Sequence, residues 1–359
     1  MGGFDNKGWC AQESAAFLSL KTALLAYFET YRATFQEFSN PLEFEGLKNK
    51  KEFDSDLYKS LYFTTITHFQ NFFELFFKDA LERIDEIFVF RWNEKFTSAL
   101  YERICRKEVR PVASDLSIEY SDALKRLLEI RKADERNPII QQIDFLLNER
   151  ETLEELNDLR NRIWHRGLFY LYYAELDLFI CKEVLPLIEQ IAKLDWYPEK
   201  QEWKYKPLSC GIDPIKDLIS EIRKDSIDLE CIALIKEMGR SAFHNPIIQK
   251  GSHTSPFVLA IAANTNREIV KNASARANVI CQKFLTDIFV CPVCGQKTLV
   301  KYEIDDYDTD YDANGNEIQV PRYIPDRIKC EVCSFEVLPN ITDLTKCGIV
   351  ESNLWDVHN

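Results

Sequence analysis

Two short stretches near the C-terminus decide the fold of that region: Cys291-Pro-Val-Cys294-Gly and Cys330-Glu-Val-Cys333. Each stretch is a tight turn that can aim two thiolates at one tetrahedral cation. Runs typical of β-strands accompany the two pairs, at 298–304, 317–323, 328 and 335–338, and Asn314-Gly315 is a strong hairpin signal. The pattern predicts a small β-rich module around one structural metal ion.

The spacing and the hairpin frame favour zinc, and the module is then a zinc ribbon. Four thiolates also suit an iron–sulfur cluster, but paired turns on successive hairpins are more typical of zinc. Two chance pairs in a chain with 11 cysteines are the remaining alternative. Because four protein ligands leave no position for water or substrate, we expect the zinc ion to be structural and not catalytic.

Composition and charge bound the function. The chain of 359 residues is 46% hydrophobic and has no low-complexity bias, which indicates an ordered protein of more than one domain. A net charge of −13 argues against general attraction to nucleic acid, although seven of the negative charges lie within 302–317. No signal peptide or membrane helix is evident, and the seven other cysteines suit reduced thiols, so we expect a cytoplasmic protein.

Helical periodicity dominates the rest of the sequence. It predicts helices at 17–35, from 54 or 55 to 81, and at 93–106, 117–132, 138–165 (in one or two pieces), 168–193 with a kink at Pro186, 213–237 and 264–288. The chain is therefore mainly α. We predict an N-terminal helix and connector (1–53), a helical domain (54–204), a second helical section (205–287), the zinc ribbon with an acidic hairpin insertion (288–345) and a C-terminal tail (346–359).

The segment Leu156-Asn-Asp-Leu-Arg160-Asn161-Arg162-Ile-Trp-His165-Arg166-Gly contains the candidate chemistry. At 100° per residue, Leu153, Leu156, Leu159 and Ile163 form one apolar stripe with Arg160 inside it. The Asn161 and His165 side chains are one helical turn apart, so amide, guanidinium and imidazole can face a common groove. Gly167 is a natural end for this helix.

This arrangement resembles the HEPN superfamily of helical ribonucleases, whose motif of Arg, a polar residue and His appears here as Arg160-Asn161-x3-His165. The resemblance covers at most residues 54–195. It implies a homodimer that cleaves RNA without a catalytic metal, with His165 as general acid and base, Arg160 at the phosphate and Asn161 orienting either of them. It also implies a toxin or antiviral-defence effector, restrained by an antitoxin or another regulatory protein.

Local positive charge could compensate for the acidic total. The candidates for contact with RNA are Arg162 and Arg166 within the motif, and Arg106, Lys107 and Arg110 upstream. Two other interpretations remain open. The helical domain could only dimerise while the zinc ribbon recognises nucleic acid, or the chain could be a scaffold in which Arg160 pairs with a carboxylate such as Glu74. The shorter Arg240-x3-His244 segment is expected to be structural or exposed to solvent.

Overall fold

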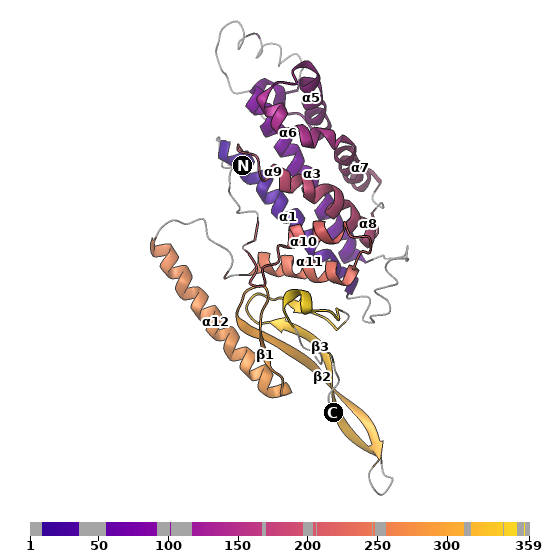
Figure 1. Cartoon of the computed structure of the whole chain (residues 1–359), viewed down its shortest axis with the longest axis vertical. Helices are drawn as coiled ribbons and strands as arrows, with labels where there is room; N and C mark the ends of the chain where they lie inside the picture. The colour runs from indigo at the N-terminus through magenta and orange to yellow at the C-terminus, as the bar shows by residue number, and fades with distance from the viewer. Residues whose placement is uncertain are drawn as a thin grey trace, which may run out of the picture. The chain divides into compact units, whose positions relative to one another are not determined.

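The computed structural model describes most of the chain, and it is mainly helical with one small antiparallel sheet (Figure 1). The chain divides into two compact units, unit 1 (1–26, 59–171 and 183–203) and unit 2 (27–58, 172–182 and 204–359). Among the described residues no helix is long and apolar enough to cross a membrane. The described residues are 9–35, 55–91, 101, 117–166, 170–196, 204–205, 207–245, 247, 256–311, 317–339, 341–349 and 355.

The helices follow the predicted periodicity over most of their length. Their bounds are α1 (Trp9–Phe35), α3 (Asp56–Ile84), α5 (Tyr120–Ala133), α6 (Pro138–Asn148), α7 (Arg150–Arg166), α8 (Tyr173–Leu178), α9 (Leu185–Ile191), α10 (Pro214–Glu221), α11 (Leu229–His244) and α12 (Pro256–Phe284). The predicted helix at 93–106 lies outside the described residues, apart from Tyr101. The predicted helix at 213–237 is wrong as one element, because 222–228 separates α10 from α11.

The aromatic side chains of α3 build the core of unit 1. Phe69, Phe72, Phe73, Phe76 and Phe77 are all fully buried. The Phe76 ring stacks on Trp196 at a centroid distance of 5.4 Å, and the Phe77 ring meets Tyr120 edge-on at 5.2 Å. Because aromatic burial dominates core energetics, these contacts hold α3 against α5 and the 194–196 segment.

Helix α7, which carries the motif, is a separate element from α6. The Asn137 side chain accepts hydrogen bonds from the first amides of α6, and the chain turns at Glu149 between the two helices. The phenol of Tyr120 on α5 donates to the Leu153 carbonyl at 2.9 Å, and Asn157 donates to Ser121 at 3.2 Å. Helix α5 therefore fixes the position of α7 within unit 1.

The helix predicted at 168–193 begins later, at Tyr173, and changes its winding before Pro186. A π-helical segment covers Phe179–Val184, between α8 and α9. Proline cannot donate a backbone hydrogen bond and its ring crowds the preceding turn, so a wider turn just before Pro186 accommodates it without ending the helix. The predicted kink is thus realised as a change in helical winding.

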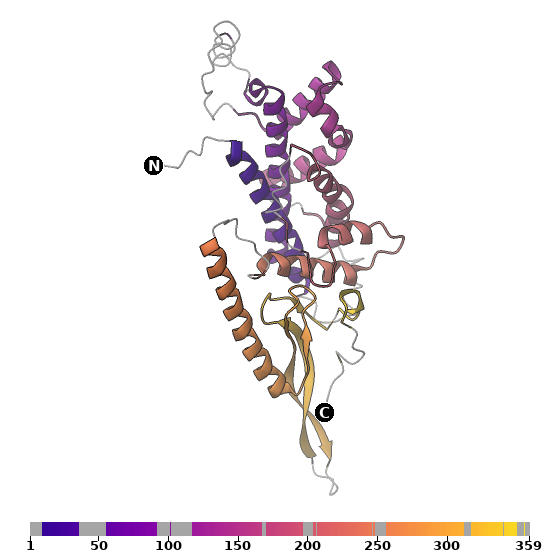
Figure 2. The same cartoon turned by 60° about the vertical axis from the view of Figure 1, so that its left-hand side comes forward.

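Unit 2 combines α10, α11 and α12 with a four-stranded sheet in the order β1-β2-β3-β4, and α12 runs alongside β2 in both views (Figures 1 and 2). The strands are β1 (Ile288–Val290), β2 (Lys297–Tyr311), β3 (Glu317–Cys330) and β4 (Glu336–Val337), all antiparallel. The prediction of separate short runs at 317–323 and 328 is wrong, since β3 is continuous and pairs with β2 over its length.

Helix α11 is buried along almost its whole length, and Gly239 shows how tightly it is packed. A Cβ atom at Gly239 would lie 2.6 Å from Cε2 of Phe28, a ring that has no exposed surface. Glycine costs a helix interior about 1 kcal/mol relative to alanine. Glycine is nevertheless favoured at this position, because the Phe28 ring leaves no room for a Cβ atom.

We predict that Gly239→Ala destabilises the protein despite the better helix propensity of alanine. Overpacking a rigid core typically costs about 1–3 kcal/mol, so after the propensity gain we expect a net loss of about 1 kcal/mol in urea unfolding. The double variant Phe28→Leu/Gly239→Ala should be less destabilised than the sum of the single changes. A stabilised Gly239→Ala protein would show that the ring moves aside freely.

Candidate functional site

The two cysteine turns have the same backbone geometry. The Cys291 amide donates to the Gln296 carbonyl and its carbonyl accepts from the Gly295 amide, both at 2.9 Å. In the second turn, Cys330 makes the equivalent bonds to Phe335 and Ser334, at 2.8 and 3.1 Å. Gly295 and Ser334 both have positive φ, 71° and 60°, as the tight turn requires. The two turns thus share one loop geometry.

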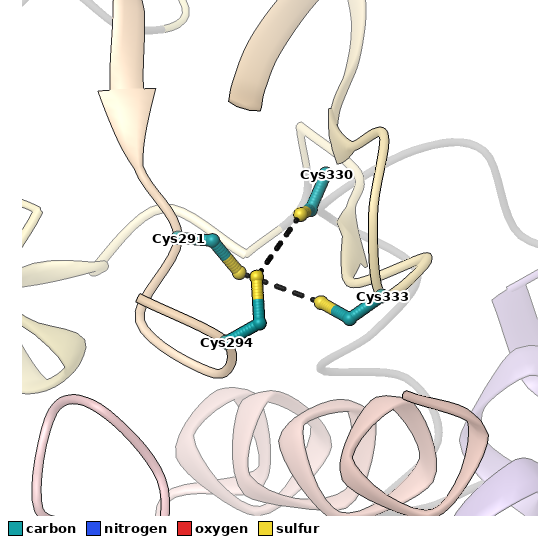
Figure 3. A group of neighbouring side chains, drawn as sticks. All are labelled: Cys291, Cys294, Cys330 and Cys333. Atoms are coloured by element: carbon teal, nitrogen blue, oxygen red, sulfur yellow. Dashed lines mark hydrogen bonds between the residues drawn. The ribbon is translucent and has the colours of Figure 1, made fainter. Parts of the chain in front are cut away.

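The four sulfurs of these turns converge, as Figure 3 shows. The Sγ atoms of Cys291 and Cys333 are 3.5 Å apart, and those of Cys294 and Cys330 are 3.6 Å apart. All four lie within 4.8 Å of one another, a grouping compatible with a structural metal. Burial raises the pKa of the Cys291 thiol, whereas hydrogen bonds from the other three thiols lower the pKa of Cys330. A bound cation would displace the protons that the thiols otherwise share.

Backbone contacts hold the first turn against the segment before α10. The amides of Ser209 and Cys210 donate to the carbonyls of Val293 and Pro292, at 3.1 and 2.9 Å. The Ser209 hydroxyl also lies close to Gly295, where a Cβ atom would be 2.8 Å from it. A side chain at residue 295 is therefore excluded by space as well as by backbone conformation.

Glu237 on α11 holds the second turn. Its carboxylate accepts hydrogen bonds from the Glu336 amide at 2.7 Å and from both Nε and Nη2 of Arg240, at 2.7 and 2.6 Å. Arg240 in turn donates to the Ser334 carbonyl inside the turn. Arg32 and the Tyr31 phenol on α1 complete the shell of donors around the same carboxylate. Arg240 is structural, as predicted, and half-exposed His244 faces Glu29 at 3.4 Å.

A second group of potential ligands, Glu221, Asp228 and Cys231, also lies within 4.8 Å. Lys224 pairs with Glu221 at 2.5 Å, and Lys346 pairs with Asp228 at 3.1 Å. The two ammonium groups neutralise the two carboxylates, so these residues form an ion-pair cluster that ties α11 to the segment near Lys346. No spacing pattern identified this group, because Glu221 ends α10 whereas Asp228 and Cys231 begin α11, and the turn between the two helices brings them together.

Arg160 and Asn161 are brought together on α7. The Nη1 atom of Arg160 donates to Oδ1 of Asn161 at 3.0 Å, and the buried Nε atom has no hydrogen-bond partner. Within the part of the chain that the structure describes, Arg160 forms no salt bridge. The alternative partner Glu74 is instead bound by Lys78 at 2.7 Å and by Gln70 at 3.2 Å. No carboxylate of the described residues therefore neutralises the guanidinium charge.

The apolar stripe of α7 is confirmed, and an aromatic pair lies beside Arg160. Leu153, Leu156 and Leu159 are buried, and Ile163 is partly buried. The Arg160 guanidinium lies 5.7 Å from the centre of the Trp164 ring, and Trp164 contacts Phe63 of α3 at a centroid distance of 5.5 Å. The periodicity of α7 did not reveal this pair, because Phe63 lies about a hundred residues upstream.

The other predicted site residues are described only in part. Arg162 is exposed on α7. The backbone of residues 165 and 166 ends α7, but the side chains of His165 and Arg166 lie outside the described part of the chain, as do Arg106, Lys107 and Arg110 entirely. Their roles stay predictions.

Comparisons with protein-family models, with curated proteins and with solved structures give no significant match.

We predict that Glu237→Gln strongly destabilises the protein. Removing one partner of a buried ion pair costs about 3–5 kcal/mol, since Arg240 would keep a buried, uncompensated charge. Urea unfolding measures the change. Glu268→Gln on the exposed side of α12 is the matched control, with an expected effect within about 0.5 kcal/mol. Equal effects of the two substitutions would mean that the ion pair of Glu237 does not contribute to the free energy of unfolding as we expect.

Proposed function

We propose that this protein is an endoribonuclease of the HEPN type, and that its active site is built on the last turn and a half of α7. The guanidinium of Arg160 carries this proposal, because it is held by the amide of Asn161 and has no carboxylate partner among the residues that the structure describes. A partly buried cation without a carboxylate partner is costly unless an anion binds it. A planar guanidinium suits the oxygens of a phosphate group.

The fold around α7 supports the same proposal. Residues 54–204 contribute the long aromatic helix α3, the motif helix α7 and an apolar helical stretch after it, the order implied by the resemblance. The helix ends directly after the predicted imidazole, where the dipole of α7 favours the imidazolium form. A separate metal module with four protein ligands supplies no open coordination position to this chemistry.

The proposed reaction needs no group beyond the side chains and the RNA. A His165 imidazole acting as base takes the proton of a ribose 2′-hydroxyl, and the 2′-oxygen attacks the adjacent phosphorus. The bond to the 5′-oxygen breaks, and a His165 imidazolium, from the partner subunit in the proposed homodimer, donates a proton to that oxygen. The products are a 2′,3′-cyclic phosphate and a 5′-hydroxyl. Arg160 stabilises the charge that develops on the phosphoryl oxygens.

The resemblance also supplies the biological setting that we propose, a cytoplasmic toxin or antiviral-defence effector under the control of an antitoxin or regulatory protein. The metal that we propose for the four-cysteine site is zinc. Zn–S bonds of about 2.3 Å in a tetrahedron put the sulfurs roughly 3.8 Å apart, near the distances between the paired sulfurs here.

We predict that the purified protein cleaves structured RNA in the presence of EDTA and that His165→Ala abolishes the cleavage. Loss of the general acid and base should lower the rate by at least about a hundredfold, measured as 5′-hydroxyl ends by RNA sequencing. Arg160→Ala should lower it strongly as well, through the loss of charge stabilisation.

Arg136→Ala is the matched control for Arg160→Ala, because Arg136 is an exposed arginine in the turn between α5 and α6. It should retain full activity. Unaltered cleavage by a folded His165→Ala protein would refute the active-site assignment. Absence of cleavage by the folded wild-type protein would favour the alternative, in which the helical domain only mediates dimerisation or serves as a scaffold.

We predict one zinc ion per chain, measured by mass spectrometry of the metal content. Cys294→Ser and Cys333→Ser should each lose the ion, because a structural site needs all four thiolates. Cys281→Ser on α12, in the same unit, should retain it. Stoichiometric iron with the visible absorption of an iron–sulfur cluster would contradict the zinc assignment.

A further inference from the structure

We propose that Trp164, Phe63 and Tyr170, interleaved with Arg160 and Lys59, form a stacking strip for unpaired nucleotides of the RNA substrate. This inference rests on the proposed function, since it takes RNA as the ligand, and it adds a substrate class: single-stranded RNA or the unpaired part of a fold. We call these five residues the stacking strip. All five belong to unit 1.

The stacking strip combines two contacts between a cation and a ring with one contact between two rings. The Arg160 guanidinium lies 5.7 Å from the centre of the Trp164 ring, which in turn contacts Phe63. Lys59, one helical turn before Phe63 on α3, places its ammonium 5.7 Å from the centre of the Tyr170 ring. Nucleic acid presents the complementary pattern, in which flat bases alternate with phosphates.

The exposure of the two central rings is unusual for a helical core. Trp164 is 56% exposed and Phe63 36% exposed, whereas Phe69, Phe72 and Phe73 further along α3 are fully buried. Burying a large aromatic side chain stabilises a protein by about 1.5–3 kcal/mol. The exposed rings of Trp164 and Phe63 do not contribute this stabilisation in full, whereas the buried rings of α3 do. Stacking on a base would recover part of it.

The charges around the stacking strip favour an anionic ligand. Residues 160–166 contain Arg160, Arg162 and Arg166 and no carboxylate. On α7, the nearest acid before the strip, Asp158, projects about 120° away from Trp164 at 100° per residue, and Glu155 projects about 180° away. An apolar protein partner would not need this arrangement of cations, whereas a single strand, with its phosphates beside its bases, does.

The position of the strip also defines its role. Trp164 lies next to Arg160, the residue proposed to contact the scissile phosphate. A base stacked on the Trp164 ring would fix the nucleotide beside that phosphate, so Trp164 acts as a positioning residue. A base paired in a duplex has no free face to offer, which makes the strip selective for unpaired nucleotides.

The test is a binding measurement that does not depend on cleavage. The probe is a fluorescent 12-nucleotide 2′-O-methyl RNA of mixed sequence, which cannot react because its 2′-oxygens are blocked. We expect Trp164→Ala to weaken binding by about fivefold to a hundredfold, the range of one lost base–aromatic stack. Trp164→Phe should retain most of the affinity. Tyr307→Ala, which removes a 62% exposed ring from β2, should leave it unchanged.

Light scattering on the same samples distinguishes the competing interpretation. An affinity that does not respond to Trp164→Ala overturns the proposal, and if that variant also becomes monomeric the strip is a contact between two copies of the chain. If Trp164→Ala weakens binding of a fully paired duplex of the same sequence as much as it weakens binding of the single strand, the proposal is also overturned. Binding that depends on Trp164 without any cleavage of ordinary RNA would refute the nuclease and leave the strip standing.

Discussion

The arrangement of unit 2 depends on one buried carboxylate. Glu237 has no exposed surface, yet it accepts hydrogen bonds from Tyr31, Arg32, Arg240 and the backbone of Glu336. A carboxylate taken out of water is stable only when charged and polar donors replace its hydration. Because these donors come from α1, α11 and the second cysteine turn, the requirement fixes three distant parts of the sequence together. The second cysteine turn is therefore attached to the helices by direct hydrogen bonds, through Glu336 and Ser334, and does not rely on apolar contact alone.

Lys236, the residue before Glu237 on α11, is a second buried charge with its own partners on another face of the helix. Lys236 is fully buried, and its ammonium pairs with Asp177 of α8 at 2.7 Å while lying 4.3 Å from the ring centres of Tyr27 and Tyr173. Desolvation lowers the pKa of Lys236, and the charge of Asp177 opposes that effect. Consecutive residues of opposite charge thus face two different sets of partners. A helix that is surrounded on all sides normally has apolar residues all round, and α11 instead uses paired charges that also specify its neighbours.

The sequence predicted what local patterns control. The cysteine turns and the apolar stripe of Leu153, Leu156 and Leu159 follow from residues close together in the chain, whereas the sequence left open whether 138–165 is one helix or two. The long β2–β3 hairpin was predicted too short, because acidic residues such as Asp305 and Asp306 have low strand propensity and pairing across the hairpin overrides it. The contacts of Glu237 with Tyr31, Arg32 and Glu336, and of Trp164 with Phe63, could not be predicted, since each joins residues about a hundred or more positions apart and no local period connects them.

The end of α7 inverts the usual distribution of side chains. A charged residue, Arg160, lies partly buried at the apolar stripe with an unpaired Nε atom, while the largest apolar side chain, Trp164, is more than half exposed one turn later. If the two residues were exchanged, the apolar ring would be buried and the charged group would be exposed to water. Folding alone therefore does not favour the present order. Natural sequences break such rules mainly where function demands it. An anionic ligand with a flat apolar surface suits both residues at once, because its phosphate oxygens can accept hydrogen bonds from the guanidinium and its base can cover the ring. The inversion at Arg160 and Trp164 is therefore the observation that most strongly supports our proposal that this helix end binds RNA.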